Sequence, residues 1–331
     1  MKRIYVSRAL PDAGMKILYE NFEVKVHHGQ DPPSREELFK ETENVEGMLV
    51  LLTEKIDKEL LQNAKNLKVV SCFSVGVDHV DLGECTKKGI IVTHTPDVLT
   101  DATADIAFAL ILSASRRIAE GDRYVRSKKW KMKWTPNLLL GYELHGATLG
   151  IVGFGRIGQA VAKRASGFSM RVVYYDRKGE NIEAARLLNS SYLKLDDLLR
   201  TSDVISVHLP LTEKTRHIFD ERAFSLMKKS AVFVNTSRGP VVDQKALVNA
   251  LKNNRIFGAG LDVYEKEPLD ENDPLLQLDD VVLVPHLGSA TVQTRSAMAE
   301  LAARNLVDAL GGKAPKAVAN KEVLSKIHLG A

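Results

Sequence analysis

The sequence predicts an α/β fold built from two doubly wound parallel sheets. Short apolar runs of strand length alternate with helical stretches over roughly the first hundred residues. The same alternation restarts at Thr148, and a long Ala- and Leu-rich segment lies between the two regions. A chain of 331 residues is long enough to form two domains of ordinary size, each with its own core.

In the N-terminal region, apolar runs with the composition of strands are separated by polar or helical segments. Ser34 and Glu37 form a capping box, in which each side chain can bond the other residue's backbone N–H at the start of a helix. The segment Asp101–Arg117 is expected to form one long helix that joins the two domains, since its terminal arginines suit the negative end of a helix dipole. The expected strands are Arg3–Ser7, Val24–Val26, Met48–Leu52, Lys68–Cys72 and Ile90–Val92.

The second region carries further apolar runs of the same kind. Beyond it, Thr291–Leu310 has the pattern of a helix whose apolar face is expected to pack on the N-terminal unit. We therefore expect a discontinuous first domain, residues 1–98 and 288–331, with a second domain, residues 99–287, inserted into it. The strands expected in the second domain lie near Ile151, Val173, Ile205, Val232, Ala259 and Val282.

A glycine pattern at the start of the second region is typical of dinucleotide-binding sites. An apolar strand runs into Gly153-x-Gly155-x-x-Gly158, a helical run follows, and a second apolar strand, Arg171–Tyr175, ends at Asp176. The three glycines would allow a tight turn, close approach of a pyrophosphate to the backbone, and close packing of helix on sheet. Asp176 lies where a carboxylate would accept hydrogen bonds from an adenosine ribose 2′-OH. The second domain is therefore expected to be a Rossmann dinucleotide-binding domain.

Composition and charge exclude several classes of function. The hydrophobic content of 44% is ordinary for a globular protein, and the longest apolar run, near Ile106–Ala114, is too short to cross a membrane. The N-terminus lacks an apolar signal segment, and Cys72 and Cys85 fit a reducing cytoplasm and no metal site. The net charge is +4, and its one concentrated run is Arg123–Lys133, with interleaved aromatic residues. We interpret this run as a helix end and a connecting arm, and we expect no nucleic-acid partner.

Four titratable residues follow apolar strands of the second region. Arg238 lies in NTSRGPVVD, Asp262 and Glu267 lie in AGLDVYEKEP, and His286 lies in PHLGSAT. Ligands of doubly wound sheets bind at the carboxyl ends of the strands, so these loops are expected to converge on a nicotinamide. A guanidinium can hold the carboxylate of a 2-oxo acid, and a histidine beside a carboxylate can donate a proton as hydride arrives.

These strings, together with GFGRIGQAVAKRASGF and TPDVLTDATADIAFAL, resemble the D-isomer-specific 2-hydroxyacid dehydrogenases. Within that family the chain is most similar to glyoxylate/hydroxypyruvate reductases, and the resemblance covers about Met1 to Asn320. It implies a flavodoxin-like substrate domain around the Rossmann domain. It also implies hydride transfer between NADH and a small 2-oxo acid, from glyoxylate to glycolate first and from hydroxypyruvate to D-glycerate second. A homodimer is implied as well.

The resemblance also implies roles for particular residues. Arg238 would bind and polarise the substrate, Glu267 would keep His286 protonated, and His286 would be the acid/base. Further substrate contacts would come from Leu52 and from the backbone amides of Val75 and Gly76. Asp262 would hold the nicotinamide carboxamide. The expected cofactor contacts are Gly153, Gly155, Arg156, Ile157, Gly158, Asp176, Arg177, Thr103, Leu209, Pro210, Thr236 and Asp262.

Several features leave alternatives open. Asp176 favours NADH, whereas Arg177 and Lys178 could attract the 2′-phosphate of NADPH. Where related reductases often carry the second tryptophan of a W-x-P-x-W string, this chain has Leu138, which leaves a preference for hydroxypyruvate open. Another D-2-hydroxyacid dehydrogenase, such as a phosphoglycerate dehydrogenase, and an NAD-sensing corepressor are the alternative functions. No added regulatory domain is expected at the C-terminus.

Overall fold

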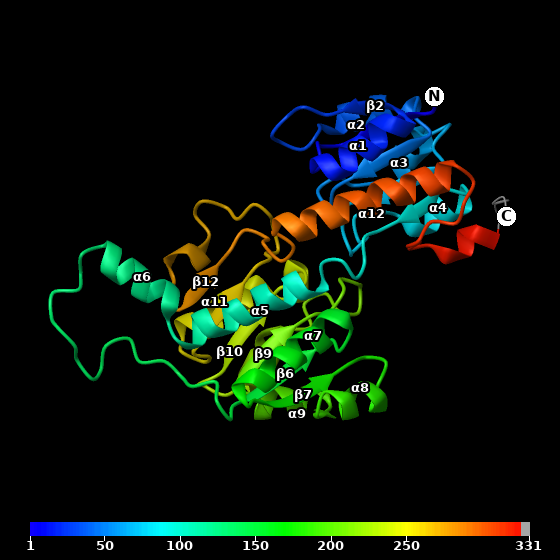
Figure 1. The fold of residues 1–331 in the computed structure, drawn as a ribbon. Helices are drawn as coiled ribbons and strands as arrows, with labels where there is room; N and C mark the ends of the chain where they lie inside the picture. The colour runs from blue at the N-terminus through cyan, green and yellow to red at the C-terminus, as the bar shows by residue number, and fades with distance from the viewer. Residues whose placement is uncertain (326–331) are drawn as a thin grey trace. The chain divides into compact units, whose positions relative to one another are not determined.

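The computed structural model describes residues 1–325, which divide into two compact units (Figure 1). The first unit consists of Met1–Leu99 and the described residues from Thr291 onward, and the second is Thr100–Ala290. Each unit contains one parallel sheet with helices on both faces, so the predicted α/β class with two doubly wound sheets is confirmed. Among residues 1–325, no helix is long and apolar enough to cross a membrane.

The sheet of the first unit has five parallel strands in the order β2-β1-β3-β4-β5, which is the flavodoxin-like order. The predicted strands agree with the observed ones to within two residues at each end. Val, Ile and Leu dominate the central strands, as expected for a sheet that is covered on both faces. The strands are β1 (Arg3–Val6), β2 (Glu23–Val26), β3 (Gly47–Val50), β4 (Val69–Cys72) and β5 (Ile91–Thr93).

Two helices cover one face of this sheet and three cover the other. On the first face, α1 (Asp12–Asn21) packs beside α12 (Val292–Leu310), and a Cβ on Gly14 would lie 2.7 Å from the carbonyl oxygen of Ala299. The predicted C-terminal helix therefore does pack on the N-terminal unit. The opposite face carries α2 (Arg35–Glu43), α3 (Lys58–Asn63) and α4 (Leu82–Lys87). The capping box at α2 is confirmed in part, since the Ser34 side chain accepts a hydrogen bond from the N–H of Glu37.

The strand predicted over Met48–Leu52 ends two residues too late, because β3 is Gly47–Val50. The Glu54 carboxylate accepts a 2.6 Å hydrogen bond from the N–H of Leu51, which removes this N–H from the sheet ladder. The chain therefore turns after Val50, and Leu52 lies in the turn rather than at the end of the strand.

The sheet of the second unit has seven parallel strands in the order β12-β11-β10-β9-β6-β7-β8. The strand order reverses at β6, and in such sheets ligands bind outside the carboxyl ends of the strands near that point. Six strands lie where the sequence predicts them, whereas β8 was not predicted because its SSY sequence is short and polar. The strands are β6 (Thr148–Val152), β7 (Arg171–Tyr175), β8 (Ser190–Tyr192), β9 (Val204–Val207), β10 (Val232–Asn235), β11 (Gly258–Leu261) and β12 (Val281–Leu283).

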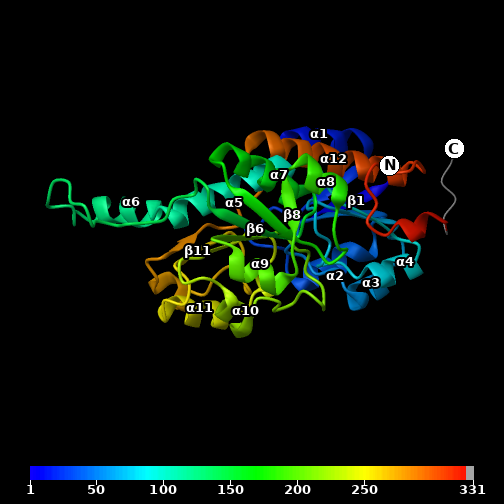
Figure 2. The same cartoon turned by 90° about the horizontal axis from the view of Figure 1, so that it is seen from below.

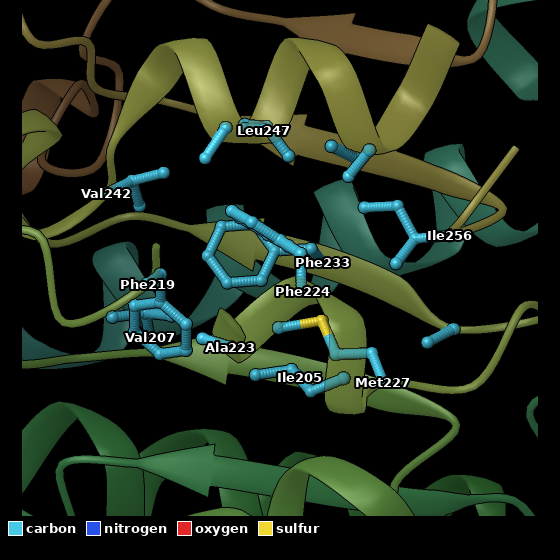
Figure 3. Packing of buried hydrophobic residues seen from close by; sticks show 14 of the residues in the cluster. Ile205, Val207, Phe219, Ala223, Phe224, Met227, Phe233, Val242, Leu247 and Ile256 are labelled. Atoms are coloured by element: carbon cyan, nitrogen blue, oxygen red, sulfur yellow. The ribbon is translucent and has the colours of Figure 1, made fainter. Parts of the chain in front are cut away.

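Two hydrophobic cores hold this sheet. On one face Phe233 of β10 makes edge contacts with Phe219 and Phe224, at ring-centroid distances of 5.0 and 5.3 Å (Figure 3). Each of these rings is fully buried, and such burial stabilises a fold by roughly 1.5–3 kcal/mol. This face is covered by α9 (Leu195–Thr201), α10 (Glu221–Leu226) and α11 (Gln244–Lys252), and the other by α5 (Thr100–Ser115), α7 (Arg156–Ala165) and α8 (Ile182–Leu187).

The prediction of one helix over Asp101–Arg117 is wrong at its C-terminal end. Helix α5 stops at Ser115, because Arg117 has a left-handed backbone with φ of 53°. A separate helix, α6 (Ile118–Arg126), follows. Helix α6 and the chain after it extend away from the sheet of their own unit as an arm (Figures 1 and 2). The basic run Arg123–Lys133 therefore forms a helix end and an arm, as the sequence predicts.

Candidate active site

Two glycines shape the turn between β6 and α7. Gly153 has a φ of +99°, and a Cβ at this position would lie 2.6 Å from the carbonyl oxygen of His208. A Cβ on Gly158 would lie 2.2 Å from the carbonyl oxygen of Gly153. A side chain at either position would therefore push the turn out of its place against the sheet.

Gly155 is different, because no protein atom requires it to be glycine. It is the N-cap of α7, its φ is −76°, and a Cβ there would meet no atom within 4 Å. Gly155 offers no side-chain acceptor to the N–H groups at the start of α7. Open space at an uncapped helix N-terminus suits a diphosphate, which needs N–H donors and the positive end of a helix dipole. Arg156 and Ile157 form the first turn of α7, with Arg156 exposed and Ile157 packed on the core.

Asp176 follows β7 and is held against the glycine turn. Its Oδ2 accepts a 3.0 Å hydrogen bond from the N–H of Phe154, and its Oδ1 accepts a 2.9 Å bond from the N–H of Lys178. Each carboxylate oxygen keeps a further lone pair, so a ribose hydroxyl could still bind. The side chains of Arg177 and Lys178 are exposed beside it.

The loop after β9 lies against the same turn. A Cβ on Gly153 would come within 3.1 Å of the backbone nitrogen of Leu209. Leu209 is buried, and the exposed Pro210 is fixed through its carbonyl oxygen, which accepts a 2.7 Å hydrogen bond from the Thr215 hydroxyl. Leu209 and Pro210 therefore lie beside the glycine turn between β6 and α7, as a cofactor contact requires.

His208 connects this loop to the end of β10. Its Nε2 lies 2.9 Å from the Ser206 hydroxyl, and its Nδ1 lies 3.5 Å from the Thr236 hydroxyl. Burial lowers the pKa of His208 to about 3, so the ring is neutral at physiological pH. A neutral ring can contact the Thr236 hydroxyl without placing a buried positive charge at this edge of the sheet.

Arg238 lies on a tightly hydrogen-bonded loop after β10. Asn235 accepts hydrogen bonds from the N–H and the hydroxyl of Ser237, at 3.0 and 2.8 Å, and donates a 3.0 Å bond to the carbonyl oxygen of Arg238. The Arg238 guanidinium donates a 2.8 Å bond to the carbonyl oxygen of Ser237. A Cβ on Gly239 would lie 1.7 Å from the carbonyl oxygen of Tyr264. Only glycine therefore lets this loop approach the loop after β11, which carries Glu267.

Glu267 and His286 form a hydrogen-bonded pair. His286 Nδ1 lies 2.8 Å from Glu267 Oε2, and Glu267 Oε1 accepts a 3.1 Å bond from the N–H of Tyr264. Burial acts to raise the pKa of Glu267, but the bonds from His286 and Tyr264 and the charge of Arg238 outweigh it, so this pKa lies below its ordinary value. Glu267 is thus an ionised acceptor that orients His286 through Nδ1. The other ring nitrogen, Nε2, makes no hydrogen bond within residues 1–325.

Asp262 holds the turn that follows His286. Asp262 is 1% exposed, and its carboxylate accepts hydrogen bonds from the N–H groups of Leu287 and Gly288, at 2.5 and 2.8 Å. Burial raises the pKa of Asp262, and these bonds and nearby His286 oppose the shift only in part. A Cβ on Gly288 would lie 3.4 Å from the Thr103 hydroxyl, so Thr103 is at the same place. The arrangement reveals a backbone-holding function of Asp262 that the sequence pattern did not suggest.

The remaining predicted residues belong to the first unit. Leu52 is 38% exposed in the turn after β3, and Val75 and Gly76 are partly exposed on the loop after β4. The structure thus brings together the residues of each unit. The catalytic and cofactor candidates follow strands of the second sheet, except Thr103, which lies in α5 beside Gly288, and the substrate candidates follow β3 and β4.

Sequence reasoning missed three residues that shape the second-unit loops, namely Asn235, His208 and Gly239. The pairing of Asn235 with a serine two residues later is a usable signal, because short polar side chains at this spacing bond the local backbone. The contact of His208 with Ser206 has the same two-residue spacing, whereas its contact with Thr236 joins two loops and has no local signal.

The chain is similar to known proteins over nearly its whole length. The family model of the D-isomer specific 2-hydroxyacid dehydrogenase, NAD binding domain, matches residues 108–288. A glyoxylate reductase from Thermofilum pendens is 50% identical over 97% of this chain and 95% of its own. The TT0316 protein from Thermus thermophilus is 46% identical with a TM-score of 0.89, covering 96% of this chain and 99% of that one.

A further solved relative carries ligands. It is an NADPH-dependent glyoxylate/hydroxypyruvate reductase from Sinorhizobium meliloti in complex with NADP and malonate, 32% identical with a TM-score of 0.84, covering 97% of this chain and 98% of that one. The match to the family model, the identity to curated relatives and the geometry of the second unit agree with one another. The chain belongs to the D-isomer specific 2-hydroxyacid dehydrogenases.

Proposed function

We propose that the protein is an NAD(P)H-dependent reductase that converts glyoxylate to glycolate, with hydroxypyruvate as a second substrate. The proposal depends above all on the 2.8 Å contact between His286 Nδ1 and Glu267 Oε2, whose loops follow β12 and β11. Arg238 lies on the neighbouring loop and acts electrostatically on Glu267. An acid/base, its carboxylate partner and a carboxylate-binding cation are the groups that 2-oxo acid reduction needs. The names of the relatives support the same substrate.

The residues around His286 carry out the proton chemistry. Because Nδ1–H donates to Glu267, the proton for the substrate carbonyl oxygen is the one on Nε2. Glu267 stays ionised and stabilises the charged ring before transfer. Arg238 binds the substrate carboxylate with its planar fork and draws electron density from the adjacent carbonyl. Bound NADH supplies the hydride.

The cofactor fits the second unit by its shape and donors. Gly155 leaves space at the uncapped start of α7 for the diphosphate, and Asp176 keeps lone pairs for the adenosine ribose. Thr103, Thr236 and Asp262 lie nearer the catalytic loops and would contact the nicotinamide end. We assign the dinucleotide-binding domain to residues 99–287, which correspond to the second unit, Thr100–Ala290, to within three residues at each end.

We assign the substrate domain to residues 1–98 and 288–331, whose described part corresponds to the first unit, Met1–Leu99 and the residues from Thr291 onward. The amides of Val75 and Gly76 would receive the substrate carboxylate, and Leu52 would pack beside the substrate. These two amides donate no hydrogen bond to any group within residues 1–325, which supports this assignment.

A single assay tests the function. Purified protein is mixed with NADH and glyoxylate, and the loss of NADH absorbance is followed for the wild type and for His286→Gln, which keeps a polar side chain but removes the proton. The expected fall in kcat is roughly 10²–10⁴. Near-wild-type turnover in the variant would refute the assignment of His286. Tight NADH binding without turnover would favour the corepressor. A higher kcat/KM for oxidation of D-3-phosphoglycerate with NAD⁺, followed by the gain of NADH absorbance, would favour a phosphoglycerate dehydrogenase.

The arm after α6 supports a homodimer. Trp134 is 85% exposed, Met132 is 70% exposed and Leu140 is 61% exposed. Large apolar side chains gathered on one projecting segment are covered most simply by a second copy related by a two-fold axis. Leu138 lies on the same arm and is 38% exposed.

We also propose a cytoplasmic location. Cys72 and Cys85 are both buried free thiols, which is the state expected of cysteines in a reducing compartment.

A further inference from the structure

The loop Ser74–Val77 has its carbonyl groups bonded and its amides open. The carbonyl oxygen of Val75 accepts a 2.8 Å hydrogen bond from His94 Nδ1, and that of Gly76 accepts a 2.7 Å bond from the Ser74 hydroxyl. The N–H groups of Val75, Gly76 and Val77 donate no hydrogen bond to any group in the part of the chain that the structure describes.

Peptide geometry links these two observations. In a planar trans peptide, the C=O of one residue and the N–H of the next point in opposite directions. The bond from His94 to the Val75 carbonyl therefore turns the N–H of Gly76 to the opposite side. In the same way, the bond from the Ser74 hydroxyl to the Gly76 carbonyl turns the N–H of Val77 away from Ser74. Neighbouring backbone N–H groups that have no protein acceptor are available to bind one anion between them.

His94 is itself anchored in the first unit. Its carbonyl oxygen accepts a 3.1 Å hydrogen bond from Asn305 of α12, whose side chain is fully buried, and its N–H donates a 3.3 Å bond to the carbonyl oxygen of Ala317. The next residue, Thr95, donates through its N–H to the carbonyl oxygen of Ser74, at 2.8 Å. The ring is thus held on a rigid segment and can act as a fixed support for the loop.

We propose that His94 is a positioning residue for the substrate carboxylate. Its Nδ1–H holds the Val75 carbonyl and so aims the Gly76 amide at the anion, while Ser74 aims the Val77 amide. This adds Val77 to the carboxylate-binding amides and assigns a role to a histidine outside the acid/base pair. The inference rests on the proposed function, in which this loop receives a 2-oxo acid.

Three variants test it. His94→Phe keeps an aromatic ring without a donor, and His94→Asn places an amide nitrogen near the position of Nδ1. His28→Phe is the matched control, because His28 is exposed in the same unit. Ser74→Ala removes the second carbonyl bond and serves if His94→Phe does not fold. Steady-state kinetics with glyoxylate and NADH are combined with calorimetric binding of oxamate, a carboxylate that is not reduced, to the NADH-bound protein.

The loss of one hydrogen bond should raise the KM for glyoxylate and the Kd for oxamate by about three- to tenfold in His94→Phe. Ser74→Ala should shift both in the same direction. His94→Asn should stay within about twofold of the wild type, since the donor is kept. The KM for NADH should not change in any variant. A merely structural role of His94 would lower Tm without raising the KM for glyoxylate relative to the KM for NADH.

Unchanged glyoxylate KM and oxamate Kd in His94→Phe or Ser74→Ala, with an active wild type, would overturn the inference alone. Failure of His94→Asn to restore binding would also overturn it. A wild type that neither reduces glyoxylate nor binds oxamate would overturn the proposed function, and the inference with it.

Discussion

Replacing Gly155 by alanine is expected to weaken NADH binding without destabilising the fold. The backbone of Gly155, with φ −76° and ψ −165°, is open to alanine, and the new Cβ would meet no protein atom within 4 Å. Folding stability should therefore stay level or rise by about 0.4–1 kcal/mol, because alanine restricts the unfolded chain. A diphosphate oxygen bonded to an amide at about 2.9 Å would, however, crowd the methyl group.

We expect the Kd for NADH to rise roughly ten- to hundredfold, equivalent to about 1.4–2.8 kcal/mol. NADH fluorescence titration gives the Kd, and thermal melting of the apoprotein gives Tm. Gly167→Ala is the control, since a Cβ there also meets no atom within 4 Å but lies beyond the end of α7. An unchanged Kd in Gly155→Ala, or a clear fall in its Tm, would refute the reasoning that this glycine is kept for the cofactor.

Four further changes have defined outcomes. Reduction consumes the proton of His286, so its rate should fall as pH rises. The pKa of Glu267 is lowered, so its carboxylate is charged at every pH above that lowered pKa. Removing the negative charge in Glu267→Gln should therefore shift the decline of the reduction rate to lower pH. A pH–rate profile that does not shift would contradict the pairing of Glu267 with His286. Gly239→Ala places a Cβ 1.7 Å from the Tyr264 carbonyl oxygen, so stability should fall by about 1–3 kcal/mol in urea unfolding, together with kcat. NADH should be preferred over NADPH by about tenfold in kcat/KM, and Asp176→Ser should erase this, whereas a native preference for NADPH would show that Arg177 dominates. Sedimentation should give a dimer that Leu140→Glu dissociates, and a wild-type monomer at micromolar concentration would count against the arm as an interface.

The order of elements could be predicted because it depends on local composition and periodicity. Eleven of the twelve strands within residues 1–325 follow apolar runs that are visible in the sequence, whereas β8 exists only because its backbone extends the sheet beside β7. The break between α5 and α6 was also invisible, since a left-handed arginine at position 117 has no distinctive sequence signal. Contacts between distant residues are present in both cases, since β8 pairs with β7 and the last residue of α5, Ser115, accepts a 2.9 Å hydrogen bond from the N–H of Tyr142.

The sequence by itself determined which chemical groups are present and at which strand ends they lie. Gly153, Asp176, Arg238, Glu267 and His286 all follow parallel strands, whose carboxyl ends must share one edge of a sheet. The sequence could not determine which atoms form hydrogen bonds with one another. The 2.8 Å pair of His286 and Glu267 joins residues on two loops, and the partners of Asp262 proved to be backbone amides. Hydrogen bonds form within tenths of an ångström, and only the packing of loops on the finished sheet sets distances that finely.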